Sequence, residues 1–278
     1  MNKYGIFYNP FKIEIKTSLN KKIDLLCRQG FSVFALNKQK NGYIKKVNYI
    51  ENFAEADIDI LLVFGGDGTI LRAFQEIIGL EIPILGFNLG RVGFLSDCQE
   101  KDFEESIEKI IRSEYILEKR IAIKGIAKKR EFYALNEILL DKGLSPKIIH
   151  LEIFRDNHLI VNLYANGVIV STPTGSTAYS LSAGGSVMEP SLDAVSITPI
   201  CAQAYSLKPI ILPINQEIKI RVGKNASEVQ VVADDNIINS LSAEEELVIR
   251  KAEFQAIFVK FYNKDFFSIL QEKLHLRT

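Results

Sequence analysis

The stretch DILLVFGGDGTILRAFQEIIG, residues 59–79, decides the fold that we predict for this chain. It opens with five consecutive apolar residues, 60–64, which are typical of a strand buried on both faces of a parallel sheet. Gly65-Gly66-Asp67-Gly68 follows, and apolar residues then recur at helical spacing, so we expect a helix from about Thr69 to Gly79. A strand, a glycine-rich loop and a helix in this order direct backbone N–H groups and the positive end of a helix dipole toward an anion.

Asp67 lies in the middle of this loop, where a phosphate-binding loop normally avoids additional negative charge. A carboxylate at this position suggests either a general base or a ligand for the metal ion that accompanies a nucleotide. The alternative is an ordinary Asp-Gly turn that caps a helix and has no part in chemistry.

The composition is that of an ordinary globular protein of about two domains, with 278 residues, 47% hydrophobic and 24% charged. Lysine plus arginine equals aspartate plus glutamate at 34 each, which argues against a general nucleic-acid or membrane-surface binder. The three cysteines are far apart, and only three histidines are present, so neither a disulfide framework nor a histidine-rich metal site is indicated. The chain shows no signal segment and no membrane-spanning apolar run, and we expect a cytoplasmic protein.

The pattern of predicted secondary structure divides the chain into two parts. Strands and helices alternate up to residue 113, the pattern of a doubly wound parallel sheet, with residues 37–50 as a lysine-rich solvated loop. Alternating and β-branched runs then replace helical periodicity, and the last 18 residues look helical again. We therefore expect an α/β domain over residues 1–114, completed by residues 261–278, and an all-β domain over residues 115–260. The strands expected in the β domain are 120–127, 132–140, 148–154, 159–164, 168–171, 218–222, 229–233 and 247–250.

A second distinctive segment, VSTPTGSTAYSLSAGG, occupies residues 170–185, and eight of its sixteen residues carry a hydroxyl. Hydroxyls and backbone amides around glycine suit a polyhydroxylated or phosphorylated ligand. The alternative is a Ser/Thr-rich loop with Thr174-Gly175 as a common turn. The Gly-x-Ser-x-Gly elbow is absent and no histidine is close in sequence, so serine-hydrolase chemistry is disfavoured.

Asn136 and Glu137 interrupt the apolar run 135–140. An adjacent amide and carboxylate can bind ribose hydroxyls or a carboxamide, since one donates and both accept hydrogen bonds. The alternative is that one of the two faces water on a half-buried strand. The P-loop motif and the Gly-x-Gly-x-x-Gly motif are both missing, so neither P-loop ATPases nor the usual nicotinamide dehydrogenases are indicated.

Taken together, these segments resemble the NAD kinases. The similarity lies in Gly-Gly-Asp-Gly-Thr at residues 65–69 with Leu71-Arg72, in Asn136-Glu137, and in the block 167–185, with further support at 190–194, 198–201 and 208–209. The first loop is shared with diacylglycerol kinases and phosphofructokinases, whereas the block 167–185 is specific. The resemblance implies an α/β nucleotide-kinase domain followed by an all-β NAD-binding domain.

The resemblance also implies an activity, the transfer of the terminal phosphate of ATP, or of another phosphoryl donor, to the 2′-hydroxyl of the adenosine ribose of NAD. The product is NADP. A divalent metal ion such as Mg²⁺ assists the transfer, and the sequence identifies no ligand for it. Members of the family are usually homodimers or homotetramers. Asp67 is then the proton acceptor, Gly68 leaves room for ribose and phosphates, and Arg72 contacts phosphates. The remaining implied NAD contacts are Asn136, Glu137, Lys147, Tyr164, Asn166, Thr177, Ala178, Tyr179, Ser180, Leu181, Ser182 and Asn236.

Three departures from the family pattern bear on NAD affinity or donor choice. Asn166 replaces the usual aspartate, Leu89 replaces a basic or polar residue, and Ala202-Gln203-Ala204 replaces Pro-His-Ser. Two other interpretations stay open: a lipid or sugar kinase that shares the Gly-Gly-Asp-Gly-Thr loop, and a non-catalytic NAD-sensing protein.

Overall fold

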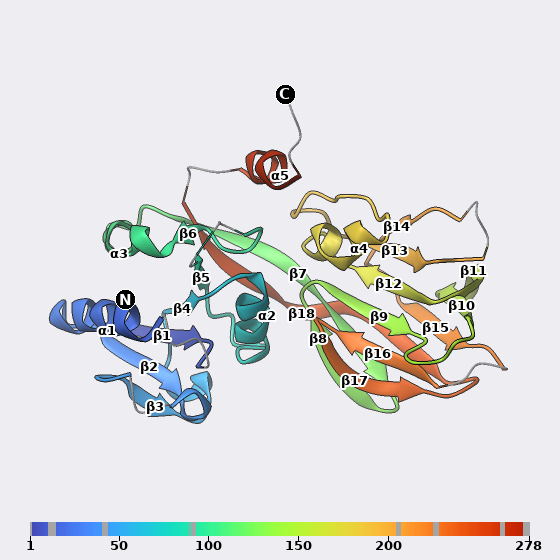
Figure 1. Ribbon diagram of the computed structural model, residues 1–278, viewed down its shortest axis with the longest axis horizontal. Coiled ribbons are helices and arrows are strands. Elements are labelled where there is room, and N and C mark those ends of the chain that lie inside the picture. Colours follow the sequence, from blue (N-terminus) through green and yellow to red (C-terminus); the bar gives the residue numbers. More distant parts are fainter. Residues whose placement is uncertain are drawn as a thin grey trace. The chain divides into compact units, whose positions relative to one another are not determined.

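The structure is a computed structural model that describes residues 2–10, 15–40, 44–88, 90, 93–203, 207–224, 228–261 and 265–274 (Figure 1). It divides into two compact units, residues 1–119 with 256–278 and residues 120–255, which we call the α/β unit and the β unit. The chain passes from one unit to the other within two long strands, β7 (Ile116–Ala127) and β18 (Glu246–Lys260). Within the part of the chain that the structure describes, no helix is both long and apolar enough to cross a membrane.

The α/β unit is built on a parallel sheet with the strand order β3-β2-β1-β4-β5. On its far side β5 pairs in parallel with β6 and, at Phe258, with the end of β18. The strands are β1 (Lys3–Tyr8), β2 (Ser32–Leu36), β3 (Asn48–Ile50), β4 (Ile60–Phe64), β5 (Ile84–Asn88) and β6 (Cys98–Gln99). The helices are α1 (Ile15–Arg28), α2 (Asp67–Gln75), α3 (Phe103–Ile111) and α5 (Phe266–Leu274), with short 3₁₀ turns η1 (Asn37–Gln39), η2 (Phe53–Glu55) and η3 (Glu100–Asp102).

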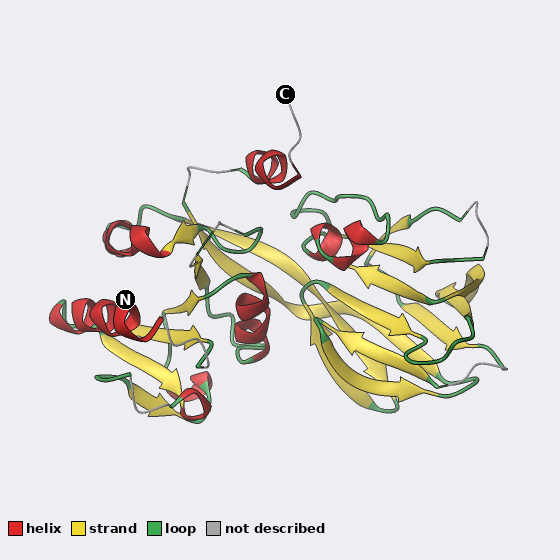
Figure 2. Ribbon diagram, viewed as in Figure 1, coloured by secondary structure: helices red, strands yellow, loops and turns green. Residues whose placement is uncertain are grey.

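Helices cover both faces of this sheet, which explains why its central strand is apolar at every position. Ile60, Leu62 and Phe64 of β4 pack in one core with residues of α1 and α3. On the opposite face lies α2, so close that a methyl group on Gly86 of β5 would come within 2.6 Å of the Ile70 side chain. The arrangement is the doubly wound α/β fold expected from the sequence, and Figure 2 distinguishes its helices from its strands.

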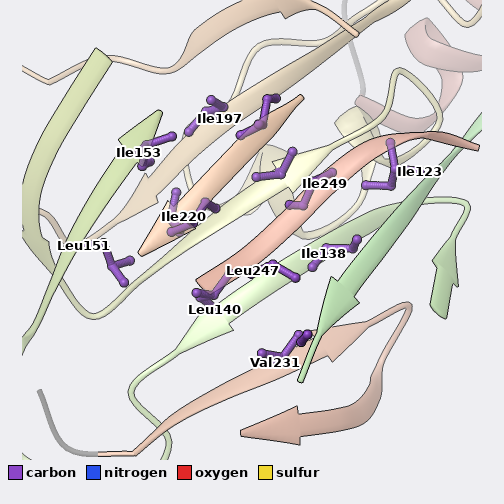
Figure 3. Packing of buried hydrophobic residues seen from close by; sticks show 14 of the residues in the cluster. Ile123, Ile138, Leu140, Leu151, Ile153, Ile197, Ile220, Val231, Leu247 and Ile249 are labelled. Carbon is purple, nitrogen blue, oxygen red and sulfur yellow. The ribbon is translucent and has the colours of Figure 1, made fainter. Parts of the chain in front are cut away.

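The β unit has two antiparallel sheets. One has the order β14-β13-β12-β9-β16-β17, and the other contains β11-β10-β15-β18 together with the β7–β8 hairpin. Isoleucine, leucine and valine side chains from both sheets form one buried core (Figure 3). The remaining strands are β8 (Arg130–Ala134), β9 (Glu137–Asp141), β10 (Ile149–Arg155), β11 (His158–Ala165), β12 (Gly167–Ser171), β13 (Ala194–Ile200), β14 (Ile210–Pro213), β15 (Ile218–Val222), β16 (Val229–Ala233) and β17 (Asn236–Leu241).

The structure corrects several expectations of local structure. The run 132–140 is not one strand, because the chain bends at Leu135 and Asn136 between β8 and β9. The lysine-rich segment 37–50 contains η1 and the strand β3, and Gln39 within it is buried. Strands β13, β14 and β17 were not anticipated, nor were η4 (Gly175–Thr177) and the single-turn helix α4 (Tyr179–Ser182) inside the hydroxyl-rich segment.

Candidate functional site

Asp67 is the first residue of helix α2. The sequence pattern suggested instead that it lies in the loop before the helix. The helix runs over 67–75 and not 69–79, because the backbone N–H groups of Thr69 and Ile70 already bond the carbonyl of Gly66. At the other end, bonds of the i→i−3 type tighten residues 76–80 into turns. An acidic residue in the first turn interacts favourably with the helix dipole.

The Asp67 carboxylate is held by a loop that follows β5. Its Oδ2 accepts a hydrogen bond from the backbone N–H of Phe94 at 2.9 Å, and its Oδ1 accepts one from Leu95 at 3.3 Å. Gly93 makes this approach possible, since a methyl group there would lie 1.9 Å from Oδ1 of Asp67. The carboxylate therefore has a fixed position at the amino end of α2.

Ser96 and Asp97 fix this loop further. The hydroxyl oxygen of Ser96, which is fully buried, accepts a hydrogen bond of 2.6 Å from the backbone N–H of Gly93. Asp97 forms an ion pair of 3.2 Å with Lys260 and also accepts a hydrogen bond from the backbone N–H of Phe261. Both charged side chains are less than one-tenth exposed, so the end of β18 anchors the loop that holds Asp67.

Packing explains one glycine of the loop and leaves another unexplained. Gly65 is required by packing, because a methyl group there would meet the Thr69 side chain at 2.4 Å. A methyl group on Gly68 would meet none of the other described residues within 4 Å, apart from its chain neighbours and the backbone of its own helix, so packing among the described residues does not explain this glycine. Arg72 lies one turn further along α2 and is exposed, and its guanidinium donates to the Gly68 carbonyl and the Thr69 hydroxyl. The Arg72 side chain thus reaches back from the last turn of α2 toward the end that carries Asp67 and Gly68.

In the β unit, Asn136 and Glu137 occupy the bend before β9 and its first residue. Neither residue is the water-facing member of a half-buried strand: Asn136 is partly buried outside any strand, and Glu137 is 7% exposed. The backbone N–H groups of Leu135, Asn136 and Glu137 all bond the carboxylate of Asp234, at 2.7, 2.8 and 3.3 Å. Asp234 was not singled out from the sequence, and its only signal there is a pair of adjacent aspartates directly after the predicted strand 229–233.

The carboxyl group of Glu137 is unusual. Burial, with the nearby carboxylates of Asp234 and Asp235, raises its pKa to about 8. Its Oε2 is buried and has no hydrogen-bond partner among the described residues. Burial also raises the pKa of Asp234, to about 6, although the three backbone N–H groups act to lower it. At neutral pH Glu137 is thus a protonated acid that can donate a hydrogen bond as well as accept one.

Most hydroxyls of the segment 170–185 serve the fold. Thr172 donates to the Leu135 carbonyl at 2.6 Å, and Ser176 donates to the Pro173 carbonyl at 2.6 Å. Ser180, one of the predicted NAD contacts, is fully buried, and its hydroxyl pairs with that of Thr198 at 3.1 Å. The predicted NAD contacts of this segment that are partly or fully exposed are Thr177, Ala178, Tyr179, Leu181 and Ser182.

The structure brings this segment to Asn136. A methyl group on Gly175 would lie 2.2 Å from the Asn136 carbonyl oxygen, and the backbone N–H of Thr172 donates to that same oxygen at 2.9 Å. Asn236 joins the group, because its side-chain amide bonds the carbonyl of Asp234 at 3.0 Å. The buried Arg120, which the sequence did not single out, reaches the Thr174 hydroxyl at 3.5 Å.

Tyr164 and Asn166 lie apart from this group. Strand β12 pairs with β9 from Ser171–Glu137 at one end to Gly167–Asp141 at the other, a span of roughly 13 Å. Asn166 precedes Gly167 and so lies at the far end from Glu137. Tyr164 stacks on His150 with ring centroids 4.5 Å apart, and both line a polar cavity of about 570 Å³ beside Arg221. Lys147 is exposed.

No group of three or more histidine, cysteine, aspartate or glutamate side chains that could hold a metal ion occurs among the described residues. Mg²⁺ usually keeps several waters and is bound through one or two carboxylates plus substrate phosphates. An ion held in that way needs no cluster of protein carboxylates. Leu89 and Ala204, two of the departures from the family pattern, lie outside the described residues.

Comparison with known proteins agrees with this architecture. The family models for the ATP-NAD kinase N-terminal and C-terminal domains match residues 5–115 and 135–261. The NAD kinase of Clostridium botulinum (strain Loch Maree / Type A3) is 38% identical over 233 residues, which cover 82% of this chain and 83% of that protein. The chain belongs to the NAD kinase family. Its two units correspond to the α/β and antiparallel β parts of NAD kinases.

Solved NAD kinase structures show the same fold. The crystal structure of yeast NADH kinase complexed with NADH has a TM-score of 0.90 and 27% sequence identity, and covers 100% of this chain and 89% of its own. An NAD kinase from Archaeoglobus fulgidus in complex with ATP has a TM-score of 0.75, also at 27% identity, over 99% of this chain and 100% of its own.

Proposed function

We propose that this protein is an NAD kinase that transfers the terminal phosphate of ATP to the 2′-hydroxyl of the adenosine ribose of NAD. The observation that carries the proposal is the Asp67 carboxylate, fixed by Phe94 and Leu95 at the amino end of α2 beside Gly68, which packing among the described residues does not require. A carboxylate and open backbone at a helix N-terminus suit a hydroxyl acceptor and a phosphate together.

In this proposal Asp67 accepts the proton of the 2′-hydroxyl while the 2′-oxygen of the ribose forms a bond to the γ-phosphorus of ATP. The bond from that phosphorus to the β–γ bridging oxygen breaks, and ADP leaves with the electron pair. A positioned carboxylate base contributes about 10²- to 10⁴-fold, because a neutral hydroxyl is a poor nucleophile. Positioning of the reactants supplies much of the remainder.

The other residues bind and orient substrates. Arg72, exposed at the same helix end, would contact phosphates. Asn136 would contact NAD through its side-chain amide, and Glu137 through its carboxyl group, whose buried Oε2 has no hydrogen-bond partner among the described residues. Tyr179, which is 44% exposed, offers a ring for stacking on a base. The remaining proposed NAD contacts are Gly68, Lys147, Tyr164, Asn166, Thr177, Ala178, Ser180, Leu181, Ser182 and Asn236.

The proposal includes three further properties: a metal ion, an oligomeric state and a cellular location. Mg²⁺, when bound with the donor phosphates, would neutralise charge that develops on the transferred group. A homodimer or homotetramer is proposed from the family resemblance. A cytoplasmic location is proposed because three free cysteines, Cys27, Cys98 and Cys201, suit a reducing compartment.

The test is an assay of purified protein with NAD, ATP and Mg²⁺, in which NADP is detected by an NADP-specific dehydrogenase. NADP formation is the expected result. Parallel reactions with diacylglycerol, a sphingoid base and fructose 6-phosphate test the lipid- and sugar-kinase alternative. Calorimetry with NAD tests the sensor alternative, which predicts tight binding with no NADP at any donor or metal concentration and would overturn the proposal.

A further inference from the structure

Asp234 occupies a two-residue turn that joins β16 to β17. Both turn residues, Asp234 and Asp235, have positive φ angles, +43° and +66°, which glycine and asparagine adopt more readily than other residues. Asp235 is exposed, whereas Asp234 is only 5% exposed. The turn conformation thus directs one of two adjacent carboxylates into the protein.

The buried carboxylate binds three consecutive backbone N–H groups. Its Oδ2 accepts from Leu135 at 2.7 Å, and its Oδ1 accepts from Asn136 at 2.8 Å and from Glu137 at 3.3 Å. The backbone N–H of Asp234 in turn donates to the Glu137 carbonyl at 3.2 Å. Successive N–H groups that converge on one anion form a strong cradle, and leaving them without an acceptor would be costly.

This arrangement sets the direction of the chain at Asn136. The bend separates β8 from β9 and turns the Asn136 carbonyl toward the N–H of Thr172, which it accepts at 2.9 Å. It also places Glu137 in register with Ser171 of β12. Without an acceptor for three adjacent N–H groups, the bend would relax toward the continuous strand that the sequence pattern of 132–140 predicts.

We propose that Asp234 is a positioning residue, whose carboxylate holds Asn136 and Glu137 in the conformation that binds NAD. The proposal deepens the function proposed above and rests on it for the identity of the ligand. Asp234 itself does not touch the substrate in this proposal, and it acts only through the backbone of residues 135–137.

The experiment uses Asp234→Asn, which retains the shape of the side chain but replaces one acceptor oxygen with a donor that faces N–H groups. The dissociation constant of NAD, measured by calorimetry on the whole chain, should rise roughly 10- to 100-fold. The KM for ATP should stay within about twofold, since the residues that Asp234 holds are proposed to contact NAD and not the phosphoryl donor. Asp235→Asn, the same change at the exposed neighbour, is the matched control and should leave both constants unchanged.

A double-mutant cycle with Asn136→Ala separates positioning from general destabilisation. If Asp234 acts through Asn136, the loss caused by Asp234→Asn should shrink several-fold in the Asn136→Ala background. Should Asp234→Asn fail to fold, Asp234→Ser, which retains one acceptor oxygen, takes its place. Fully additive losses, or an NAD dissociation constant within twofold of wild type, would overturn the proposal.

Amide hydrogen exchange gives a readout that needs no ligand. Exchange at residues 135–137 should be at least tenfold faster in Asp234→Asn than in wild type and unchanged in Asp235→Asn. Unchanged exchange at these residues would contradict the proposed role of the Asp234 carboxylate even if NAD affinity fell. Failure of the proposed function is seen separately, as absence of NADP with the wild-type protein.

Discussion

The backbone nitrogen of Phe94 lies 2.9 Å from Oδ2 of Asp67, so a loop 27 residues away holds the carboxylate at the start of α2. The hydrogen bond crosses from the end of one strand to the helix that follows its neighbour, where ligands bind in open α/β sheets. It orients the carboxylate without neutralising it, because the donor is an uncharged backbone group. A general base needs both properties.

Replacing this carboxylate tests its role as a base. Asp67→Asn should lower turnover by about two to four orders of magnitude, while the NAD dissociation constant stays near wild type, because the amide has the same size but cannot take a proton. Stopped assays of NADP formation and calorimetry measure the two quantities. Asp57→Asn, at a side chain that is 97% exposed in the same unit, is the control. Full turnover in Asp67→Asn would remove Asp67 from the role of base.

Gly68→Ala should separate stability from activity. Among the described residues, nothing beyond the chain neighbours and the helix backbone lies within 4 Å of the added methyl group, and alanine is the better helix former, so the free energy of unfolding should be unchanged or higher by up to about 1 kcal/mol. Turnover should nevertheless fall by about tenfold or more, because the methyl group displaces the reacting groups. Gly86→Ala, whose methyl group would meet Ile70 at 2.6 Å, should instead lose both stability and activity. Wild-type kinetics in Gly68→Ala would show that no substrate approaches this residue.

The raised pKa of Glu137 predicts how stability depends on pH. Between the pKa of an unfolded glutamate, about 4.3, and the folded value of about 8, the folded state binds one proton more than the unfolded state. This group therefore makes stability fall as pH rises through that window, by at most about 1.4 kcal/mol per pH unit.

Glu137→Gln removes this titration, so its denaturation midpoint should fall less than that of wild type between pH 5 and 8. Denaturant titrations followed by circular dichroism at several pH values give the two slopes. Glu131→Gln, at an exposed position of the β unit, should keep the wild-type slope. Equal slopes in wild type and Glu137→Gln would mean that Glu137 is ionised in the folded protein.

The buried ion pair between Asp97 and Lys260 predicts a large stability effect. Asp97→Asn leaves the Lys260 ammonium uncompensated in a site less than one-tenth exposed, and should cost about 3–5 kcal/mol of unfolding free energy. Glu217→Gln breaks the more exposed pair with Arg250 and should cost about 0–1 kcal/mol. A double variant, Asp97→Leu with Lys260→Met, should regain much of the loss. A cost below about 1 kcal/mol for Asp97→Asn would contradict this account.

The sequence predicted the elements whose cause is local. The apolar run of β4, the glycines after it and the helical spacing of α2 are patterns among residues close together in the chain. The predicted α/β and all-β classes of the two parts were confirmed. Boundaries were less accurate: α2 begins two residues earlier than expected, because Gly66 and not the Asp-Gly pair caps it.

The features that were missed have distant causes. The bend between β8 and β9 depends on Asp234, which lies 98 residues from Asn136 in the chain. The buried hydroxyls of Thr172, Ser176 and Ser180 bond partners that only the folded sheet supplies. The short strand β3 follows a lysine-rich segment without strong alternation and is fixed by pairing with β2. The roles of the individual site residues stay predictions.

Strand β18 has a consequence for protein synthesis. Its final residues pair with β5 of the α/β unit, yet they leave the ribosome only after every residue of the β unit. The part of the molecule that emerges first is thus the last to be completed. A chain released before residue 256 would leave part of one edge of β5 without its neighbour, and such unpaired edges recruit other chains. Premature termination anywhere in the β unit should therefore yield aggregates and not a free nucleotide-binding fragment.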